Sequence, residues 1–95
     1  MARRREPPPV RFEQADLPAE LRPANVTIEQ FVSPDERPPS YWSQADAPHY
    51  TQWRQIHALR RWQDAIAQWG ASQGLDARQL RGSALWPTHP PRFRR

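Results

Sequence analysis

The sequence predicts an all-α fold built on one long central helix, with short flanking helices and extended, proline-rich arms at both ends. Residues 49–74 lie in the only proline-free run of more than twenty residues, and they contain three of the five tryptophans. Their apolar side chains recur at intervals of three and four, which is typical of a helix and not of an alternating strand. The residues in this pattern are Tyr50, Trp53, Ile56, Leu59, Trp62, Ile66 and Trp69.

Both ends of the central helix carry their own signals. Ser43 or Asp46 can cap the start, and Pro48 fits a first turn, where its missing N–H costs nothing. Gly74 is typical of the left-handed residue that stops a helix. We therefore predict a helix from about Pro48 to Gln73.

Two shorter helices are expected on either side of the central one. The first is predicted at Thr27–Val32, where the apolar spacing forms one face that needs a partner. The second is predicted at Asp76–Arg81, with the aspartate as its cap and Gly82 closing it. Asp16 can also cap a single helical turn at residues 17–21, between two prolines.

The length allows one small domain, and we expect it at residues 11–87. A proline-rich linker at residues 33–48 lies within this domain. A disordered arginine- and proline-rich arm is expected at residues 1–10, and a basic tail at residues 88–95, whose last residues should fray. The predicted centre of the core is Leu59, Trp62 and Ile66.

The net charge of +4 conceals a strong polarity along the chain. Residues 6–46 carry −5, whereas residues 47–95 carry +6. Because opposite charges attract, we expect the acidic segment Glu13–Glu36 to lie against the long helix. The predicted contacts are Ile28 and Phe31 on Trp53 and Ile56, and the arginines shielded by them are Arg54, Arg60 and Arg61.

The composition argues against most catalytic and metal sites. The chain has no cysteine, which excludes disulfides and thiolate zinc sites. His49, His57 and His89 do not share a helical face, and no glycine-rich phosphate loop or nucleophile motif is present. We therefore predict a protein that is not an enzyme and that holds no metal and no cofactor.

The N-terminal sequence MARRREPPPV is basic but is not followed by an apolar run. This pattern does not fit a secretory signal, and no stretch of the chain is apolar enough to cross a membrane. We therefore expect a cytoplasmic protein without a membrane partner.

The aromatic content favours a small non-catalytic regulatory or adaptor protein that binds a protein partner or a larger assembly. Trp, Tyr and Arg are enriched at binding hot spots, and proline-rich arms are suited to lying across a partner. A homo-oligomer is compatible with the same features. The alternative is that the tryptophans simply form the core of a minimal domain. The predicted partner-binding residues are Tyr41, Trp42, Trp53, Trp69 and Trp86.

The alternative function is that of a small basic DNA-binding protein with a partial helix-turn-helix at residues 66–82. Gly70 and Gly74 let two helices approach, and leucines five residues apart close the corner, which is the packing logic of that motif. Against it, Gly82 cuts the second helix to under two turns, and an ordinary helix–glycine–helix corner explains the same spacing. Gly70 should also weaken the long helix by roughly 1 kcal/mol relative to alanine. The arginines assigned to nucleic acid are Arg54, Arg60, Arg61, Arg78, Arg81, Arg92, Arg94 and Arg95.

Overall fold

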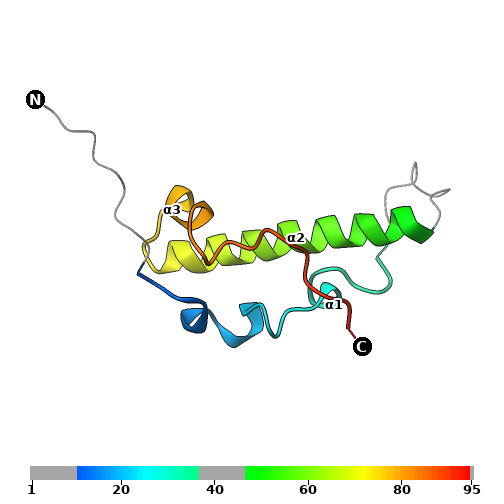
Figure 1. Cartoon of the computed structure of the whole chain (residues 1–95), viewed down its shortest axis with the longest axis horizontal. Helices are drawn as coiled ribbons and strands as arrows, with labels where there is room; N and C mark the ends of the chain where they lie inside the picture. The colour runs from blue at the N-terminus through cyan, green and yellow to red at the C-terminus, as the bar shows by residue number, and fades with distance from the viewer. Residues whose placement is uncertain (1–10, 37–46, 95) are drawn as a thin grey trace, which may run out of the picture.

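The computed structural model of the protein describes residues 11–36 and 47–94 (Figure 1). Its elements are two 3-10 turns, η1 (Gln14–Asp16) and η2 (Ala19–Leu21), and three α-helices, α1 (Ile28–Phe31), α2 (Ala47–Ser72) and α3 (Ala77–Arg81). Within these two ranges there is no β-strand, and the one sheet-like contact is an isolated bridge between Thr27 and Arg92. The predicted all-α class with one long helix is therefore confirmed.

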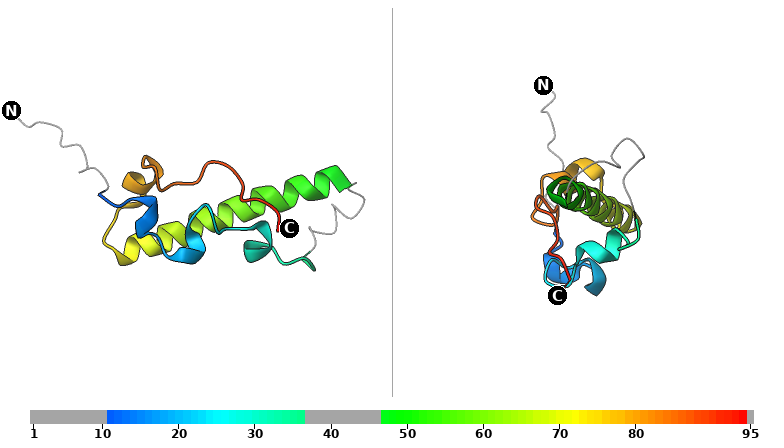
Figure 2. Two further views of the ribbon diagram at one scale, coloured as in Figure 1. Left: turned by 60° about the horizontal axis from the view of Figure 1, so that its bottom comes forward. Right: turned by 90° about the vertical axis from the view of Figure 1, so that its right-hand side faces the viewer.

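Helix α2 is the longest element of the described chain, and two largely irregular segments lie along it, antiparallel to it (Figures 1 and 2). We call residues 11–36 the N-terminal segment and residues 83–94 the return segment. The N-terminal segment starts beside Trp69, near the end of α2, and finishes at Tyr50, near its start. The return segment follows the same direction and reaches α1 through the bridge at Thr27.

The ends of α2 follow the local signals in the sequence. The helix ends at Ser72, one residue before the predicted end. Gly74 adopts a left-handed φ of 79°, and its N–H donates to the carbonyl of Ala71 at 3.0 Å. The N–H of Leu75 donates to the carbonyl of Gly70 at 2.8 Å. These two bonds form a Schellman stop, which satisfies carbonyls that the helix leaves unpaired.

The short helices begin as predicted, because their caps are local. Thr27 and Gln30 form a capping box at α1, which ends at Phe31, one residue early. Asp76 accepts from the N–H of Arg78 at 3.2 Å and starts α3. The single turn predicted at residues 17–21 is instead split into η1 and η2. Proline disfavours a helical backbone at the residue that precedes it. Leu17, which precedes Pro18, is accordingly extended, with ψ 150°.

The core consists of two clusters along α2. The main cluster contains Leu17, Leu21, Val26, Trp62, Ile66, Leu80 and Leu85. The second cluster contains Ile28, Val32, Trp53 and Ala58. Trp62 and Ile66 are central as predicted, whereas Leu59 is partly buried at the edge of the main cluster.

The N-terminal segment is part of the core and not a removable cover. Among the described residues it supplies five of the eleven buried hydrophobic side chains. It also accepts the one hydrogen bond that the buried indole of Trp62 makes, through the carbonyl of Leu21 at 3.0 Å. Its removal would therefore open both clusters, and a truncated chain is not expected to fold.

The expected contact of the acidic segment with Ile56 is wrong. Ile56 is 55% exposed, whereas Ala58, two residues later, is fully buried. Ile28 does pack with Trp53, and Val32 lies in the same cluster. From Ala58 on, the buried residues of α2 are spaced four apart. Each step of four rotates the buried stripe by about 40° around the helix axis, whereas a step of three would rotate it in the opposite direction.

The end of the return segment is held in place, contrary to the fraying expected there. The N–H of Ile28 donates to the carbonyl of Arg92 at 2.9 Å. The N–H of Arg94 donates to the carboxylate of Glu29 at 2.7 Å. These bonds tie the return segment to the start of α1. Within the described residues, none of the helices combines the length and the apolar character that a membrane crossing requires.

Candidate binding surfaces

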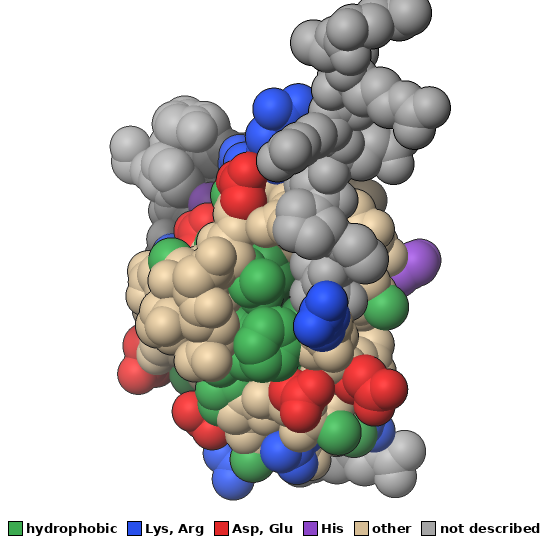
Figure 3. Space-filling model, turned by 90° about the vertical axis from the view of Figure 1, so that its left-hand side faces the viewer, with side chains coloured by type: hydrophobic (Ala, Val, Ile, Leu, Met, Phe, Trp, Pro, Cys, Tyr) green, Lys and Arg blue, Asp and Glu red, His purple; other side chains and the backbone are tan. Residues whose placement is uncertain are grey.

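The end of the molecule at which α2 stops carries a partly exposed apolar surface. The rings of Phe12 and Trp69 meet edge to face, with centroids 5.3 Å apart and planes at 79°. Leu75 follows the helix stop, and all three side chains pack on the main cluster while remaining partly exposed. Figure 3 shows hydrophobic side chains gathered on the surface at this end. We call Phe12, Trp69 and Leu75 the aromatic end.

Local structure holds the aromatic end in position. Trp69 lies seven residues after the buried Trp62, so both lie on nearly the same side of α2. Phe12 is followed by Glu13, the residue that caps η1, whose N–H donates to the carboxylate of Asp16 at 2.7 Å. The side-chain amide of Gln14 donates to the carbonyl of Ala84 at 3.2 Å, which links η1 to the return segment. Trp69 on α2 and Phe12 beside η1 are therefore both fixed in position by the structure around them.

Charges of both signs adjoin the aromatic end. The residues next to Phe12 are Arg11 and Glu13, and Asp76 follows Leu75; all three are exposed. In Figure 3, acidic and basic side chains lie around the hydrophobic ones. An apolar centre with a polar rim is the common anatomy of a protein–protein interface. A phosphate-binding surface would instead be dominated by positive charge.

The other aromatic residues predicted to bind a partner fall into three groups. Trp53 is 8% exposed, stacks on Tyr50 with centroids 6.0 Å apart, and contacts His57, so it belongs to the second cluster. Trp86 is partly exposed and packs on the main cluster. Tyr41 and Trp42 lie outside the described residues. Of these five residues, only Trp69 and Trp86 lie in the described part of the chain and have a partly exposed side chain.

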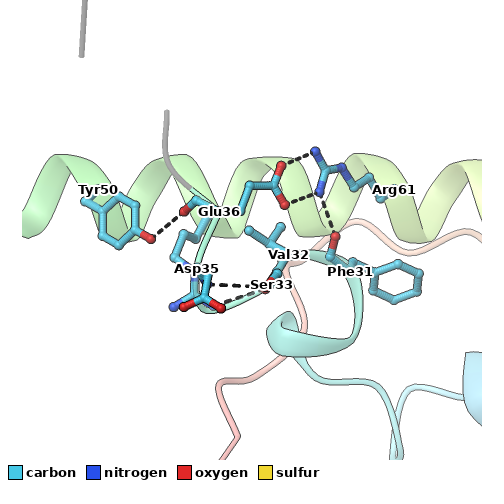
Figure 4. Close-up of polar contacts among 8 residues, drawn as sticks. Phe31, Val32, Ser33, Asp35, Glu36, Tyr50 and Arg61 are labelled. Atoms are coloured by element: carbon cyan, nitrogen blue, oxygen red, sulfur yellow. Dashed lines mark hydrogen bonds and ion pairs between the residues drawn. The ribbon is translucent and has the colours of Figure 1, made fainter. Parts of the chain in front are cut away.

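Arg61 holds the end of α1 and the residues that follow it (Figure 4). Its guanidinium pairs with both carboxylate oxygens of Glu36, at 2.6 and 2.8 Å, and donates to the carbonyl of Phe31 at 2.7 Å. The hydroxyl of Tyr50 donates to the backbone carbonyl of Glu36 at 2.8 Å. The hydrogen bond from Arg61 lowers the pKa of Glu36, although burial opposes it, and the same bond raises the pKa of Arg61.

Arg54 lies one residue after Trp53 and is more deeply enclosed than Arg61. It donates to the carbonyl of Val32 at 3.1 Å and lies 3.9 Å from the carboxylate of Glu29, with its side chain 13% exposed. The guanidinium carbon is 5.9 Å from the centre of the Tyr50 ring and 5.6 Å from that of Phe93. Its Nε is buried and has no hydrogen-bond partner among the described residues. Arg54 and Arg61 thus cap carbonyls at the end of α1.

The remaining arginines assigned to nucleic acid are not brought together into one site. Arg60, Arg78 and Arg81 are exposed, and none of their guanidinium groups has a hydrogen bond or ion pair with the described residues. Arg92 donates to the carbonyl of Ala24 at 2.8 Å. The predicted shielding therefore applies to Arg54 and Arg61 but is wrong for Arg60. Arg94 is exposed, and Arg95 lies outside the described residues.

The corner between α2 and α3 has the packing expected of the partial helix-turn-helix. Leu80 is fully buried against Gly70, and a Cβ atom at Gly70 would collide with the Leu80 side chain. Gly70 is therefore required for close approach, in addition to any cost to the helix. Helix α3 has only five residues, with Arg78 and Arg81 both exposed.

Among the described residues, no three histidine, aspartate or glutamate side chains lie close enough to hold a metal ion. No protein-family model matches this chain, and neither a curated protein nor a solved structure is significantly similar to it.

Proposed function

We propose that the protein is a small, non-catalytic regulatory or adaptor protein that binds a protein partner through its aromatic end. The observation that carries this proposal is the partly exposed edge-to-face pair of Phe12 and Trp69. Tryptophan is among the residue types that dominate binding energies at interfaces. The pair is held by the core beneath it, so little conformational entropy would be lost when a partner docks.

The distribution of the other aromatic and basic groups also supports this choice. Trp53 and Trp62 are buried, and Arg54 and Arg61 are bonded to carbonyls of the N-terminal segment. These groups stabilise the fold and are therefore not available to a protein partner.

A site-specific photocrosslinker at Gln73 tests the proposal. Gln73 is exposed and lies four residues after Trp69. In cells that naturally produce the protein, this position should capture one protein other than a second copy of this chain, whereas the same crosslinker at the exposed Thr51, near the other end of α2, should not capture that protein. The captured protein is then purified and its affinity is measured directly.

The Trp69→Leu variant keeps an apolar side chain on the core but removes the indole from the surface. We expect its affinity for the purified partner to fall by about tenfold or more, as at a binding hot spot. Thr51→Ala is the matched control and should bind as the unaltered protein does. Equal crosslinking from both positions, or unchanged affinity of Trp69→Leu with its fold intact by circular dichroism, would contradict the proposal.

DNA binding is a second candidate function, supported by the exposed Arg78 and Arg81 on α3 after the Gly74 stop. Three residues apart on one helix, they can reach the same groove or phosphate backbone. A gel-shift series at two salt concentrations is the test. A DNA complex should weaken steeply with added salt, and an Arg78→Ala/Arg81→Ala variant should weaken it further. Absence of a shift at low salt would exclude this candidate.

A further inference from the structure

A row of exposed side chains runs along the face of α2 that the rest of the described chain leaves uncovered. Its members are spaced four residues apart, and all are exposed: Gln52, Ile56, Arg60, Asp64 and Gln68. Ile56 is 55% exposed, more than Phe93 at 36%, and no other large hydrophobic side chain of the described residues is as exposed as these two. No side chain of the row has a hydrogen bond or ion pair with the described residues. Seen end-on in Figure 2, α1 and the return segment lie to one side of α2.

We propose that this row binds a second copy of the chain, with the two α2 helices antiparallel and a two-fold axis between Arg60 and Asp64. Charge complementarity between the two copies supports this arrangement. In this register, Arg60 of each copy faces Asp64 of the other, so two opposite-charge pairs form from one pair of residues. A two-fold axis requires such a self-complementary surface, because the same patch is used on both sides.

The charges also exclude the neighbouring registers. With the axis on Arg60, the two arginines would face each other; with the axis on Asp64, the two aspartates would do so. A parallel arrangement in register would oppose both like pairs at once. Like charges in contact are unfavourable, and they select against wrong partners and registers. The order of charges along the row therefore specifies one arrangement.

The spacing of the row also suits helix packing. Rows of residues four apart form the ridges that interlock in the commonest class of helix pair, with axes crossing at about −50°. Beside the row lie Ala67 and Ala71, whose small side chains leave room for a neighbouring ridge. In the proposed register Ile56 packs on the aliphatic part of Gln68 of the second copy. The contact contains one large apolar residue per chain, so the dimer should be reversible and sensitive to salt.

Exchange of charges between two variants tests the arrangement. Analytical ultracentrifugation of the full chain should show a concentration-dependent dimer. Arg60→Asp and Asp64→Arg each replace two attractions by two repulsions, and each should weaken self-association by about tenfold or more. An equimolar mixture of these two variants should form a heterodimer, because the aspartate introduced in one chain then faces the arginine introduced in the other. The double variant Arg60→Asp/Asp64→Arg should dimerise as the unaltered chain does.

Arg78→Asp is the matched control, because it makes the same substitution at an exposed arginine outside the row. It should dimerise normally. Circular dichroism should show an unchanged helix content in every variant, since all three altered residues are exposed. The proposal is overturned if the unaltered chain stays monomeric at millimolar concentration. It is equally overturned if the single variants still dimerise, or if their mixture does not. None of these outcomes depends on the proposed partner of the aromatic end.

Discussion

The two halves of α2 are stabilised in different ways. In the half that ends at Ser72, seven buried apolar residues from four parts of the chain, Trp62 and Ile66 among them, form the main cluster. In the half that begins at Ala47, only four of the described buried residues, Trp53 among them, form the second cluster. There the N-terminal segment is held by side chains of α2 that donate to its carbonyls: Tyr50 and Arg54 from this half, and Arg61 from just beyond the middle of the helix.

The difference shows how a small domain can order a segment with little secondary structure. Where enough apolar area is available, burial holds the segment, because burial scales with area and needs no particular direction. Where the apolar area runs short, long polar side chains of the helix reach the backbone instead. Net hydrogen bonds contribute only about 0.5–1.5 kcal/mol each, so this half should be the less stable one.

Removal of the central side chain of the main cluster should have the largest effect. Trp62 is 4% exposed and donates to the Leu21 carbonyl. Trp62→Ala should cost roughly 3–5 kcal/mol in unfolding free energy, enough to unfold a marginal domain. Urea denaturation followed by circular dichroism measures this. An unchanged transition midpoint would mean that this half does not depend on apolar burial.

The next largest loss of stability is expected from the arginines of α2 that hold the N-terminal segment. Arg54→Met keeps an unbranched side chain but removes the donor to the Val32 carbonyl and the cation beside Glu29. We expect a loss of about 1–3 kcal/mol, the range for an acceptor left without its partner. Arg61→Met, at a site whose arginine side chain is 40% exposed, should cost under about 1 kcal/mol because solvent screens the pair. If Arg61→Met lowered the unfolding free energy more than Arg54→Met did, ion pairing and not burial of the guanidinium would determine how strongly the N-terminal segment is held.

A methyl group at Gly70 probes how tightly the α2–α3 corner is packed. Overpacking against Leu80 should cost roughly 1–3 kcal/mol, offset by about 1 kcal/mol from the better helix propensity of alanine. We therefore expect Gly70→Ala to destabilise the protein by up to about 2 kcal/mol. In a Leu80→Ala background the collision disappears, and the same change should stabilise by up to about 1 kcal/mol.

Gly74→Ala is the control for this pair of substitutions. Its cost arises from a φ of 79°, with no atom of the described residues within 4 Å of the added Cβ, so Leu80→Ala should not alter it. Thermal denaturation of the single and double variants gives all the differences. If Gly70→Ala destabilised equally in both backgrounds, Leu80 would not be the residue that limits space at Gly70.

The smallest effect is a pH dependence at Glu36. Its pKa is lowered in the folded protein by the hydrogen bond from Arg61, so the pair stabilises the fold above the unfolded pKa near 4.5 and loses that contribution as the pH falls through the folded value. The side chain of Glu36 is 30% exposed, and the contribution should be within about 0–1 kcal/mol. Glu36→Gln should therefore be slightly less stable than the unaltered protein at pH 7, and this difference should shrink as the pH falls through the lowered pKa of Glu36. A difference that grows as the pH falls would reverse the sign of this argument.

The sequence by itself determined the features that arise within a few residues of the backbone. Proline in the first turn, the left-handed glycine at Gly74 and the cap at Asp76 act over one turn, so the extent of α2 and the start of α3 could be predicted closely. Trp62 and Ile66 could be placed in the core for a similar reason, since the helix itself sets their spacing.

Only the tertiary structure decided which side of α2 is buried and which charges meet. Ile56 is exposed and Ala58 is buried because of the path that the N-terminal segment takes across the helix, which the spacing along α2 does not specify. For the same reason Arg61 pairs with Glu36 while Arg60, its neighbour in sequence, stays exposed. The ion pair between Arg61 and Glu36 joins residues 25 positions apart in the chain, and the spacing of residues within one helix gives no information about such distant contacts.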